Sequence, residues 1–179
     1  MKGIIFTELV DFVERHAGST ALEEILERSG LSTGGAYTTV GNYPHEEAVR
    51  IVLTVSNELG TPAEDLMRQF GRELFPRFVN LYPQFFEGVT DAQTLLRGIQ
   101  THIHDEVEKL YPESNPPRFD VSSEDHALVI TYNSHRPMAS VAMGLIEGCV
   151  AHFGQPLVVR RDENAPQSDT EARFSIAAM

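Results

Sequence analysis

Three polar residues at alternate positions, Tyr132, Ser134 and Arg136, come at the end of an apolar run that is typical of a strand. In an extended chain, alternate side chains point to the same face, so two hydroxyls and one guanidinium would lie in a row. Such a row can bind one or two carboxylates that are removed from water. An ordinary edge strand with polar side chains facing solvent has the same spacing. The row therefore predicts a carboxylate site while leaving a plain surface strand open.

Two histidines, His102 and His104, lie inside a helical pattern. At about 100° per residue their side chains point in different directions, so an intact helix cannot use both for one metal ion. His102 and Glu106 have the i, i+4 spacing of a possible metal pair, but a solvated ion pair has the same spacing. His104 borders the apolar stripe, where a neutral imidazole can ligate iron or can simply be a hydrogen-bonded histidine at the edge of the core. The helical pattern alone does not choose between the two histidines.

Composition limits the classes of function. The chain has 179 residues, with 14 Lys and Arg against 26 Asp and Glu, and a net charge of −12. This charge disfavours nucleic-acid binding, which requires a surplus of cations. The single cysteine, Cys149, excludes a disulfide within the chain and any zinc site built from several of its thiolates. No apolar stretch reaches the roughly 20 residues of a membrane span, and the polar start is unlike a secretory signal. We expect a cytoplasmic protein that is not inserted in a membrane.

The elements that must position these residues are helices first and strands later, which predicts an α+β fold. Thr20 and Glu23 form a capping-box pattern, and Thr61-Pro62 combines an N-cap with a proline at the first helical position. The expected helices are Lys2–His16, Thr20 to Gly30, Pro44 to Gly60, Thr61 to Phe78, Asp91–Tyr111 and Met138–Phe153. The expected strands are Phe119–Val121, Ala127–Tyr132, Pro156–Val159 and Ala172–Ile176. They predict a small, mostly antiparallel sheet packed against helices.

Four motifs together resemble the bacterial heme nitric oxide/oxygen binding (H-NOX) family. They are the Met1–Phe6 run, Phe70-Gly71, the run from Ile103 to Tyr111, and the Tyr132-x-Ser134-x-Arg136 triplet. The resemblance covers essentially the whole chain. It implies one heme-binding sensor domain over 1–179, with a helical distal lobe over about 1–60, a proximal lobe with a four-stranded antiparallel sheet over about 61–179, and heme b buried between the lobes.

The resemblance also implies roles for individual residues. His104 is expected to be the proximal ligand of the heme iron, and Tyr132, Ser134 and Arg136 are expected to hold the propionates. Pro117 matches the family proline that presses on the heme and bends the macrocycle. A proline at that position is equally compatible with a simple end to the preceding helix.

Ligand choice is expected to depend on the distal wall. By the same resemblance, the tyrosine and asparagine of oxygen-binding members fall on Val141 and Leu74, which have no donor. The wall would comprise Ile5, Leu9, Leu74, Phe78, Val141 and Leu145, although each is also a plausible ordinary core residue. Bound oxygen needs a hydrogen bond in an apolar pocket, whereas nitric oxide does not. We therefore expect nitric oxide and carbon monoxide as ligands and exclusion of oxygen.

The resemblance further implies a signalling mechanism. Nitric oxide is expected to weaken the bond between iron and His104. The helix that carries His104 is then released, which allows the protein to change between two states. The expected partner is a separate histidine kinase or cyclic-di-GMP enzyme. The segment after Val159 lacks the cysteines and histidine of the zinc site found in some relatives, so we expect no zinc and a polar turn at Asn164–Asp169.

Two alternatives remain open. A heme enzyme would need a distal acid–base group or a thiolate ligand, which the apolar distal residues do not supply. A heme-free interaction module of the same fold could use Arg136 for another small carboxylate. A hydrolase is disfavoured because the sequence has no G-x-S-x-G or H-E-x-x-H motif, and Gly34-Gly35 alone is not a phosphate loop.

Overall fold

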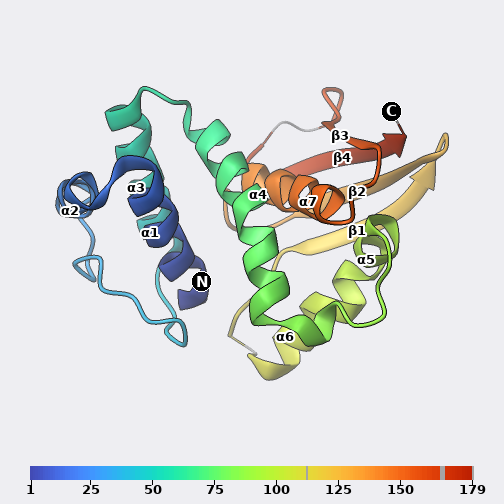
Figure 1. Cartoon of the computed structure of the whole chain (residues 1–179), viewed down its shortest axis with the longest axis horizontal. Helices are drawn as coiled ribbons and strands as arrows, with labels where there is room; N and C mark the ends of the chain where they lie inside the picture. Colours follow the sequence, from blue (N-terminus) through green and yellow to red (C-terminus); the bar gives the residue numbers. More distant parts are fainter. Residues whose placement is uncertain (112, 166–167, 179) are drawn as a thin grey trace. The chain divides into compact units, whose positions relative to one another are not determined.

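The computed structural model describes residues 1–111, 113–165 and 168–178. The chain divides into two compact units, Met1–Phe70 and Gly71–Met179 (Figure 1). The boundary lies inside helix α4 (Ala63–Leu81), which begins one residue after Pro62. The sequence placed the division of the two lobes about ten residues earlier, at the start of this helix.

The N-terminal unit contains α1 (Gly3–Ala17), α2 (Ser19–Arg28), α3 (His45–Leu59) and the first part of α4. Phe12 of α1 and Phe70 of α4 meet edge to face with ring centroids 5.5 Å apart. The predicted capping box at Thr20 is wrong, because α2 already begins at Ser19 and its N-cap is Gly18. Gly18 has a φ of 87°, a conformation that glycine adopts readily and that turns the chain sharply from α1 into α2.

A buried carboxylate holds the loop between α2 and α3 in this unit. Glu47 is 2% exposed and accepts hydrogen bonds from Ser32 Oγ, from Thr33 Oγ1 at 2.7 Å and from Tyr37 Oη at 2.7 Å. Burial raises the pKa of Glu47, but these hydrogen bonds outweigh burial and bring the pKa to about 2. Tyr37 also stacks on Phe6 of α1, with ring centroids 4.6 Å apart. The carboxylate therefore fixes the loop against α1.

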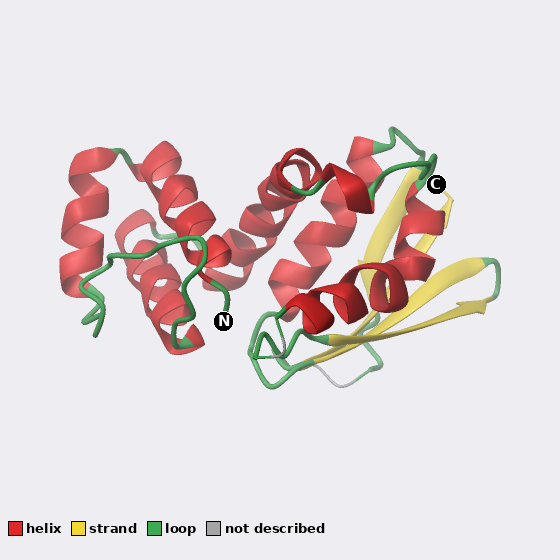
Figure 2. Ribbon diagram, turned by 90° about the horizontal axis from the view of Figure 1, so that it is seen from below, coloured by secondary structure: helices red, strands yellow, loops and turns green. Residues whose placement is uncertain are grey.

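The C-terminal unit contains the sheet. Among the described residues, β1 (Arg118–Glu124), β2 (Ala127–Asn133), β3 (Leu157–Arg161) and β4 (Glu171–Ala178) form one antiparallel sheet in the order β1-β2-β4-β3. Figure 2 shows the strands beside the helices of this unit. Phe119, Tyr132 and Ala172 lie opposite one another across three strands and are buried. The α+β fold and the predicted strands are confirmed.

Helix α7 (Ala139–His152) packs against α4 through glycines. A Cβ atom added at Gly148 would lie 2.7 Å from Cβ of Phe75 and 2.8 Å from the carbonyl oxygen of Arg72. A Cβ atom at Gly71 would lie 2.3 Å from the carbonyl oxygen of Val141. Only glycine leaves room for such close backbone approach, so the two helices pack backbone to backbone.

The segment before the sheet departs from the expected single helix over Asp91–Tyr111. It consists of α5 (Ala92–Gly98), a π-helical turn η2 (Ile99–His104) and α6 (Asp105–Leu110), and it follows the short helix η1 (Pro83–Phe85). Gly98, a weak helix former, comes just before the π turn. Gln100 within the turn donates from Nε2 to Asp105 Oδ1 at 2.9 Å and accepts from the Phe119 backbone N–H at 3.0 Å. These side-chain hydrogen bonds stabilise the π turn at a place where the apolar spacing predicts a regular α-helix.

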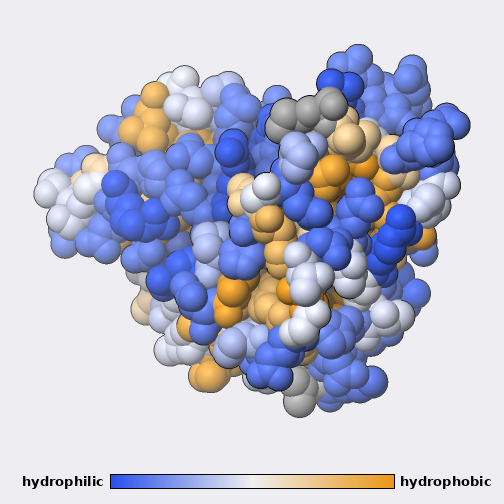
Figure 3. All heavy atoms as spheres, turned by 45° about the vertical axis from the view of Figure 1, so that its right-hand side comes forward, coloured by the Kyte–Doolittle hydropathy of each residue, from blue (hydrophilic) through white to orange (hydrophobic). Residues whose placement is uncertain are grey.

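Across the described ranges, every helix is too short or too polar to span a bilayer. The face drawn in Figure 3 is largely hydrophilic, with apolar atoms gathered in smaller areas between polar ones. The predicted turn at Asn164–Asp169 includes residues 166 and 167, which lie outside the described residues.

Candidate functional site

The structure distinguishes between the two histidines, which the sequence pattern alone does not. His102 is exposed, and its ring lies 6.3 Å from the ring of Phe85. His104 is half-buried, and its Nδ1 atom is fully covered without a hydrogen-bond partner within the described part of the chain. Burial lowers the pKa of His104 to about 4, although the Pro117 backbone and the charge of Asp105 act in the opposite direction. The imidazole is therefore neutral at pH 7 and has a lone pair available for a metal.

His104 occupies the last position of the π turn η2, and aromatic contacts connect it to the sheet. Its ring lies 5.2 Å from that of Phe119 on β1, which lies 5.4 Å from that of Tyr132 on β2. Gln100 adds the polar connection, because it binds the Phe119 backbone and the Asp105 carboxylate next to His104. Sequence reasoning missed both Gln100 and Phe119, since neither belongs to a recognisable motif.

Tyr132, Ser134 and Arg136 come together by a different route from the expected extended row. Strand β2 ends at Asn133, and the chain bends over residues 135–137. Ser134 Oγ accepts from the Arg136 backbone N–H at 3.0 Å, and Tyr132 Oη donates to the Arg136 carbonyl at 3.4 Å. The Ser134 backbone N–H donates to the carbonyl of Thr170 at 2.9 Å, which fixes the bend to the sheet. The three residues therefore lie together because of a turn, and not because of the extended strand that their spacing predicts.

Burial changes the proton affinities in this group. Tyr132 is 2% exposed, and burial raises the pKa of its hydroxyl while the Ser134 hydrogen bond and the Arg136 charge oppose the rise. Burial also lowers the pKa of Arg136, and the nearby Tyr132 acts in the opposite direction. A guanidinium stays charged throughout the physiological range, so the group presents one cation and two hydroxyls.

Arg136 also holds the loop that follows α6. Its Nη1 donates to the carbonyl of Asn115 at 2.9 Å, and its Nη2 donates to the carbonyl of Ser114 at 2.8 Å. Asn115 has a φ of 42°, which asparagine tolerates better than most residues. No sequence motif indicates these contacts.

The remaining predicted residues lie on several elements. Pro117 comes just before β1, and its backbone lies near the His104 ring. Ile5 and Leu9 belong to α1 in the N-terminal unit. The other four line the two helices that pack through glycines, namely Leu74 and Phe78 on α4 and Val141 and Leu145 on α7. Leu74 and Val141 are buried, and none of the four side chains has a hydrogen-bond donor.

The donor set of the C-terminal unit fits heme. A half-buried, neutral imidazole suits an iron ligand, and a guanidinium with two hydroxyls suits propionates. The described residues contain no cluster of three or more His, Cys, Asp or Glu side chains that could hold a metal ion by themselves. A single histidine is sufficient when a porphyrin supplies the other ligands.

Comparisons with known proteins agree with this chemistry. A family model described as Haem-NO-binding matches residues 2–161. The comparison with curated proteins gives no match.

Three solved H-NOX structures are similar to the chain. The Fe(II) unliganded protein from K. algicida is 30% identical, with 99% of this chain and 96% of that chain covered and a TM-score of 0.90. The protein from Shewanella woodyi, bound to IWP-051 in the Fe(II)CO state, is 34% identical, with 100% and 95% covered and a TM-score of 0.84. The S. oneidensis protein in the Fe(II)NO state is 28% identical, with 100% and 99% covered and a TM-score of 0.88. With its fold, its donor set and its family match in agreement, the chain belongs to the Haem-NO-binding (H-NOX) family of heme-based gas-sensor domains, which are not enzymes.

Proposed function

We propose that this chain senses nitric oxide at ferrous heme b, also binds carbon monoxide, excludes oxygen, and signals to a separate partner through release of His104 from the iron. The observation that carries the proposal is the half-buried, neutral His104 at the end of a π turn, with its ring against Phe119 of the sheet. When bound, heme would supply an iron atom that can bind both a protein ligand, here His104, and a diatomic gas.

In this proposal each polar residue has a defined task. His104 donates a lone pair from its neutral ring, and the low pKa keeps protons from competing at pH 7. Tyr132, Ser134 and Arg136 hold the propionates by charge-assisted hydrogen bonds. Pro117, a rigid residue whose backbone lies beside the His104 ring, would press on the macrocycle.

Exclusion of oxygen is proposed from side chains that lack donors. Ile5, Leu9, Leu74, Phe78, Val141 and Leu145 form the proposed distal wall. Partial negative charge on bound oxygen would find no hydrogen bond from these side chains, whereas nitric oxide and carbon monoxide do not depend on one. The Fe(II)NO state of the S. oneidensis relative and the Fe(II)CO state of the Shewanella woodyi relative support these two gases as ligands.

Signalling is proposed to begin at η2. Release of His104 would leave the π turn held to the sheet through Gln100 and the aromatic contact with Phe119. A partner that binds the released form better than the bound form would shift the equilibrium between them. We propose a histidine kinase or a cyclic-di-GMP enzyme as that partner, in the cytoplasm. Co-purification of the partner with the heme-loaded protein, with and without nitric oxide, tests this part.

The decisive test of the ligand assignment is the absorption spectrum of the purified ferrous protein alone and with nitric oxide, carbon monoxide and air. We expect a Soret band that shifts with nitric oxide and carbon monoxide, and no stable oxygen complex. A stable oxygen complex would contradict the donor-free wall. Absence of a Soret band after addition of hemin would instead favour a heme-free carboxylate-binding module.

A pair of variants tests the iron ligand. His104→Gly is expected to lose native iron coordination and to regain a five- or six-coordinate spectrum when imidazole is supplied. His102→Ala is the matched control, because His102 is exposed two residues away, and its spectrum is expected to equal that of the wild type. The opposite pattern would refute the assignment of His104.

A further inference from the structure

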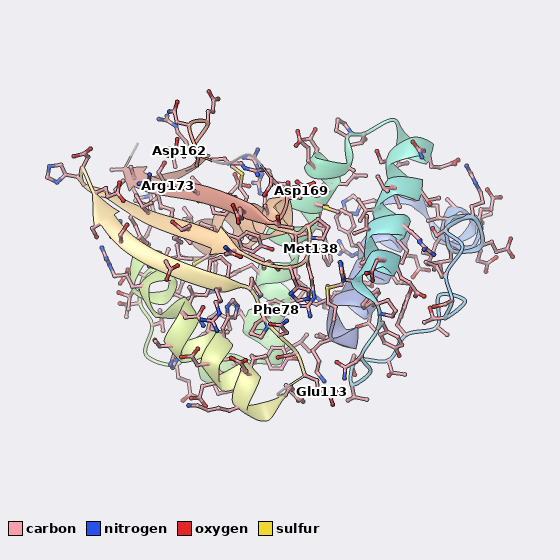
Figure 4. The ribbon with its side chains drawn as sticks, turned by 180° about the vertical axis from the view of Figure 1, so that it is seen from behind. Phe78, Glu113, Met138, Asp162, Asp169 and Arg173 are labelled. Carbon is pink, nitrogen blue, oxygen red and sulfur yellow. The ribbon has the colours of Figure 1, made fainter. Side chains whose placement is uncertain are left out.

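Arg136 makes two contacts that the proposed function does not use. That function assigns its charge to a carboxylate, but its Nη1 and Nη2 atoms donate to two successive backbone carbonyls, those of Asn115 at 2.9 Å and Ser114 at 2.8 Å. The planar guanidinium suits such a pair, because its N–H groups form a rigid fork. The loop after α6 (residues 113–117) begins at Glu113, which Figure 4 labels together with Met138, the residue after the bend that carries the guanidinium.

The conformation of the loop after α6 depends on such a donor. Ser114 is 5% exposed, which leaves its backbone little access to water, and a carbonyl without a donor is unfavourable there. Asn115 has a φ of 42°, a left-handed conformation that few residues other than glycine adopt. The two guanidinium bonds act on these two residues. Loss of the guanidinium is therefore expected to loosen the loop.

The loop after α6 leads directly to His104. Two prolines, Pro116 and Pro117, follow the carbonyls that the guanidinium holds, and their rings leave the backbone few alternative conformations. The backbone of Pro117 lies beside the His104 ring. Two residues further on, the ring of Phe119 lies 5.2 Å from the same imidazole. A short, stiff segment therefore connects the two carbonyls with the groups that lie against His104.

We infer that Arg136 is a positioning residue for His104, which it orients through the loop after α6, in addition to its proposed task of binding a carboxylate. This role rests on the proposed function, in which His104 is the iron ligand. The two tasks use different properties of one side chain, because the charge serves the carboxylate and the fork shape fixes the loop. A guanidinium has five N–H donors, so the two bonds to the loop leave others for an anion.

The variant Arg136→Lys distinguishes between the two tasks. Lysine keeps the positive charge, but its ammonium group has no planar fork and does not reproduce the paired bonds to two carbonyls. Arg161→Lys is the matched control, because Arg161 Nη2 also donates to a loop carbonyl, that of Ser168 at 2.7 Å. Ser168 belongs to the loop between β3 and β4, so the control loses the same kind of contact at a different loop.

Hydrogen exchange of the heme-loaded proteins, followed by NMR, measures the loop after α6 itself. The backbone N–H of Ser114 donates to the carbonyl of Tyr111 at 2.8 Å, so its exchange reports the opening of this loop. We expect this N–H to exchange about tenfold faster in Arg136→Lys than in the wild type, which is the effect of losing one hydrogen bond to a charged group. Arg161→Lys is expected to keep the wild-type rate. An unchanged rate in Arg136→Lys would overturn the inference.

Resonance Raman spectroscopy of the ferrous proteins measures whether the loop acts on His104. Each protein is loaded with heme and, separately, with its dimethyl ester, in which the carboxylates have no charge. We expect Arg136→Lys to shift the iron–histidine stretching frequency equally with both hemes, and Arg161→Lys to leave it unchanged. A shift with free heme alone, or with neither heme, would overturn the inference. If Arg136→Lys does not fold, Arg136→Gln, which also lacks the fork, is measured against the same outcomes.

Failure of the positioning role is distinct from failure of the proposed function. A wild-type protein that takes up no heme refutes the sensor itself. A wild-type protein with a Soret band that responds to nitric oxide, combined with an Arg136→Lys variant that keeps the wild-type stretching frequency with esterified heme, refutes only the positioning role of Arg136.

Discussion

Replacing Glu47 by glutamine removes a buried charge while keeping nearly the same shape. The carboxylate is 2% exposed and is held by Ser32, Thr33 and Tyr37. The hydrogen bonds lower its pKa from 4.5 to about 2, a difference that corresponds to about 3 kcal/mol of stabilisation of the charged form. Solvent screening reduces part of this effect. We therefore expect Glu47→Gln to lower the free energy of unfolding at pH 7 by about 2 kcal/mol.

The pH dependence gives the prediction its sign. Because the pKa of Glu47 is lower in the folded state, its contribution is fully present above the unfolded pKa of 4.5 and is lost as the pH falls through about 2. The difference between wild type and Glu47→Gln should thus be constant from pH 7 to about 5 and shrink toward pH 2. Urea unfolding followed by circular dichroism at several pH values measures it.

A neighbouring glutamate provides the control. Glu46, the preceding residue on α3, has a side chain that is 62% exposed and lies 3.5 Å from His45 Nδ1. Glu46→Gln should change the stability by less than about 0.5 kcal/mol. A Glu47→Gln variant as stable as this control at pH 7, or a loss that stays the same down to pH 2, would refute the reasoning from a buried charge.

Three further substitutions test separate parts of the C-terminal unit. Gln100→Leu removes both hydrogen bonds that support the π turn. We expect heme to stay bound and resonance Raman spectroscopy of the ferrous protein to show a shifted iron–histidine stretching frequency. An unchanged frequency would show that Gln100 does not position His104. Gly148→Ala places a Cβ atom 2.7 Å from Phe75, so it should lower the free energy of unfolding by about 1–3 kcal/mol in the same urea assay, and a neutral result would contradict the close backbone packing. Val141→Tyr introduces a donor into the proposed distal wall and should produce an oxygen complex that is visible in the absorption spectrum, whereas Val141→Phe, which has no hydroxyl, should not.

Local patterns predicted much of the fold because they depend on neighbouring residues. The helix from Pro44 to Gly60 was correct, since Gly60 takes the left-handed conformation that ends α3. The strands were found from short apolar and β-branched runs. The π turn was not, because the apolar residues from Leu96 to Val107 fit an ordinary α-helix equally well, and the Gln100 contacts that support the turn join residues up to 19 positions apart.

For the proposed polar site, the sequence and the resemblance indicated the residue types but not their geometry, and the roles of these residues stay a prediction. Family resemblance singled out His104, and burial now distinguishes it from His102. The role of Glu47 had no sequence signal, because a glutamate looks the same whether its partners are water or distant side chains. Only the folded chain shows which buried polar atoms are satisfied and which are not.

The glycine contacts between α4 and α7 bear on two properties of a gas sensor, namely its choice of ligand and its response to that ligand. Because Gly71 and Gly148 leave no gap between the backbones, the C-terminal part of α4 and α7 have little freedom to slide past each other. Leu74 and Phe78 therefore keep a constant spacing from Val141 and Leu145, whatever happens at the helix that carries His104. Under the proposed roles of these residues, gas preference would change by substitution on the helix pair while the segment that carries His104 is left intact.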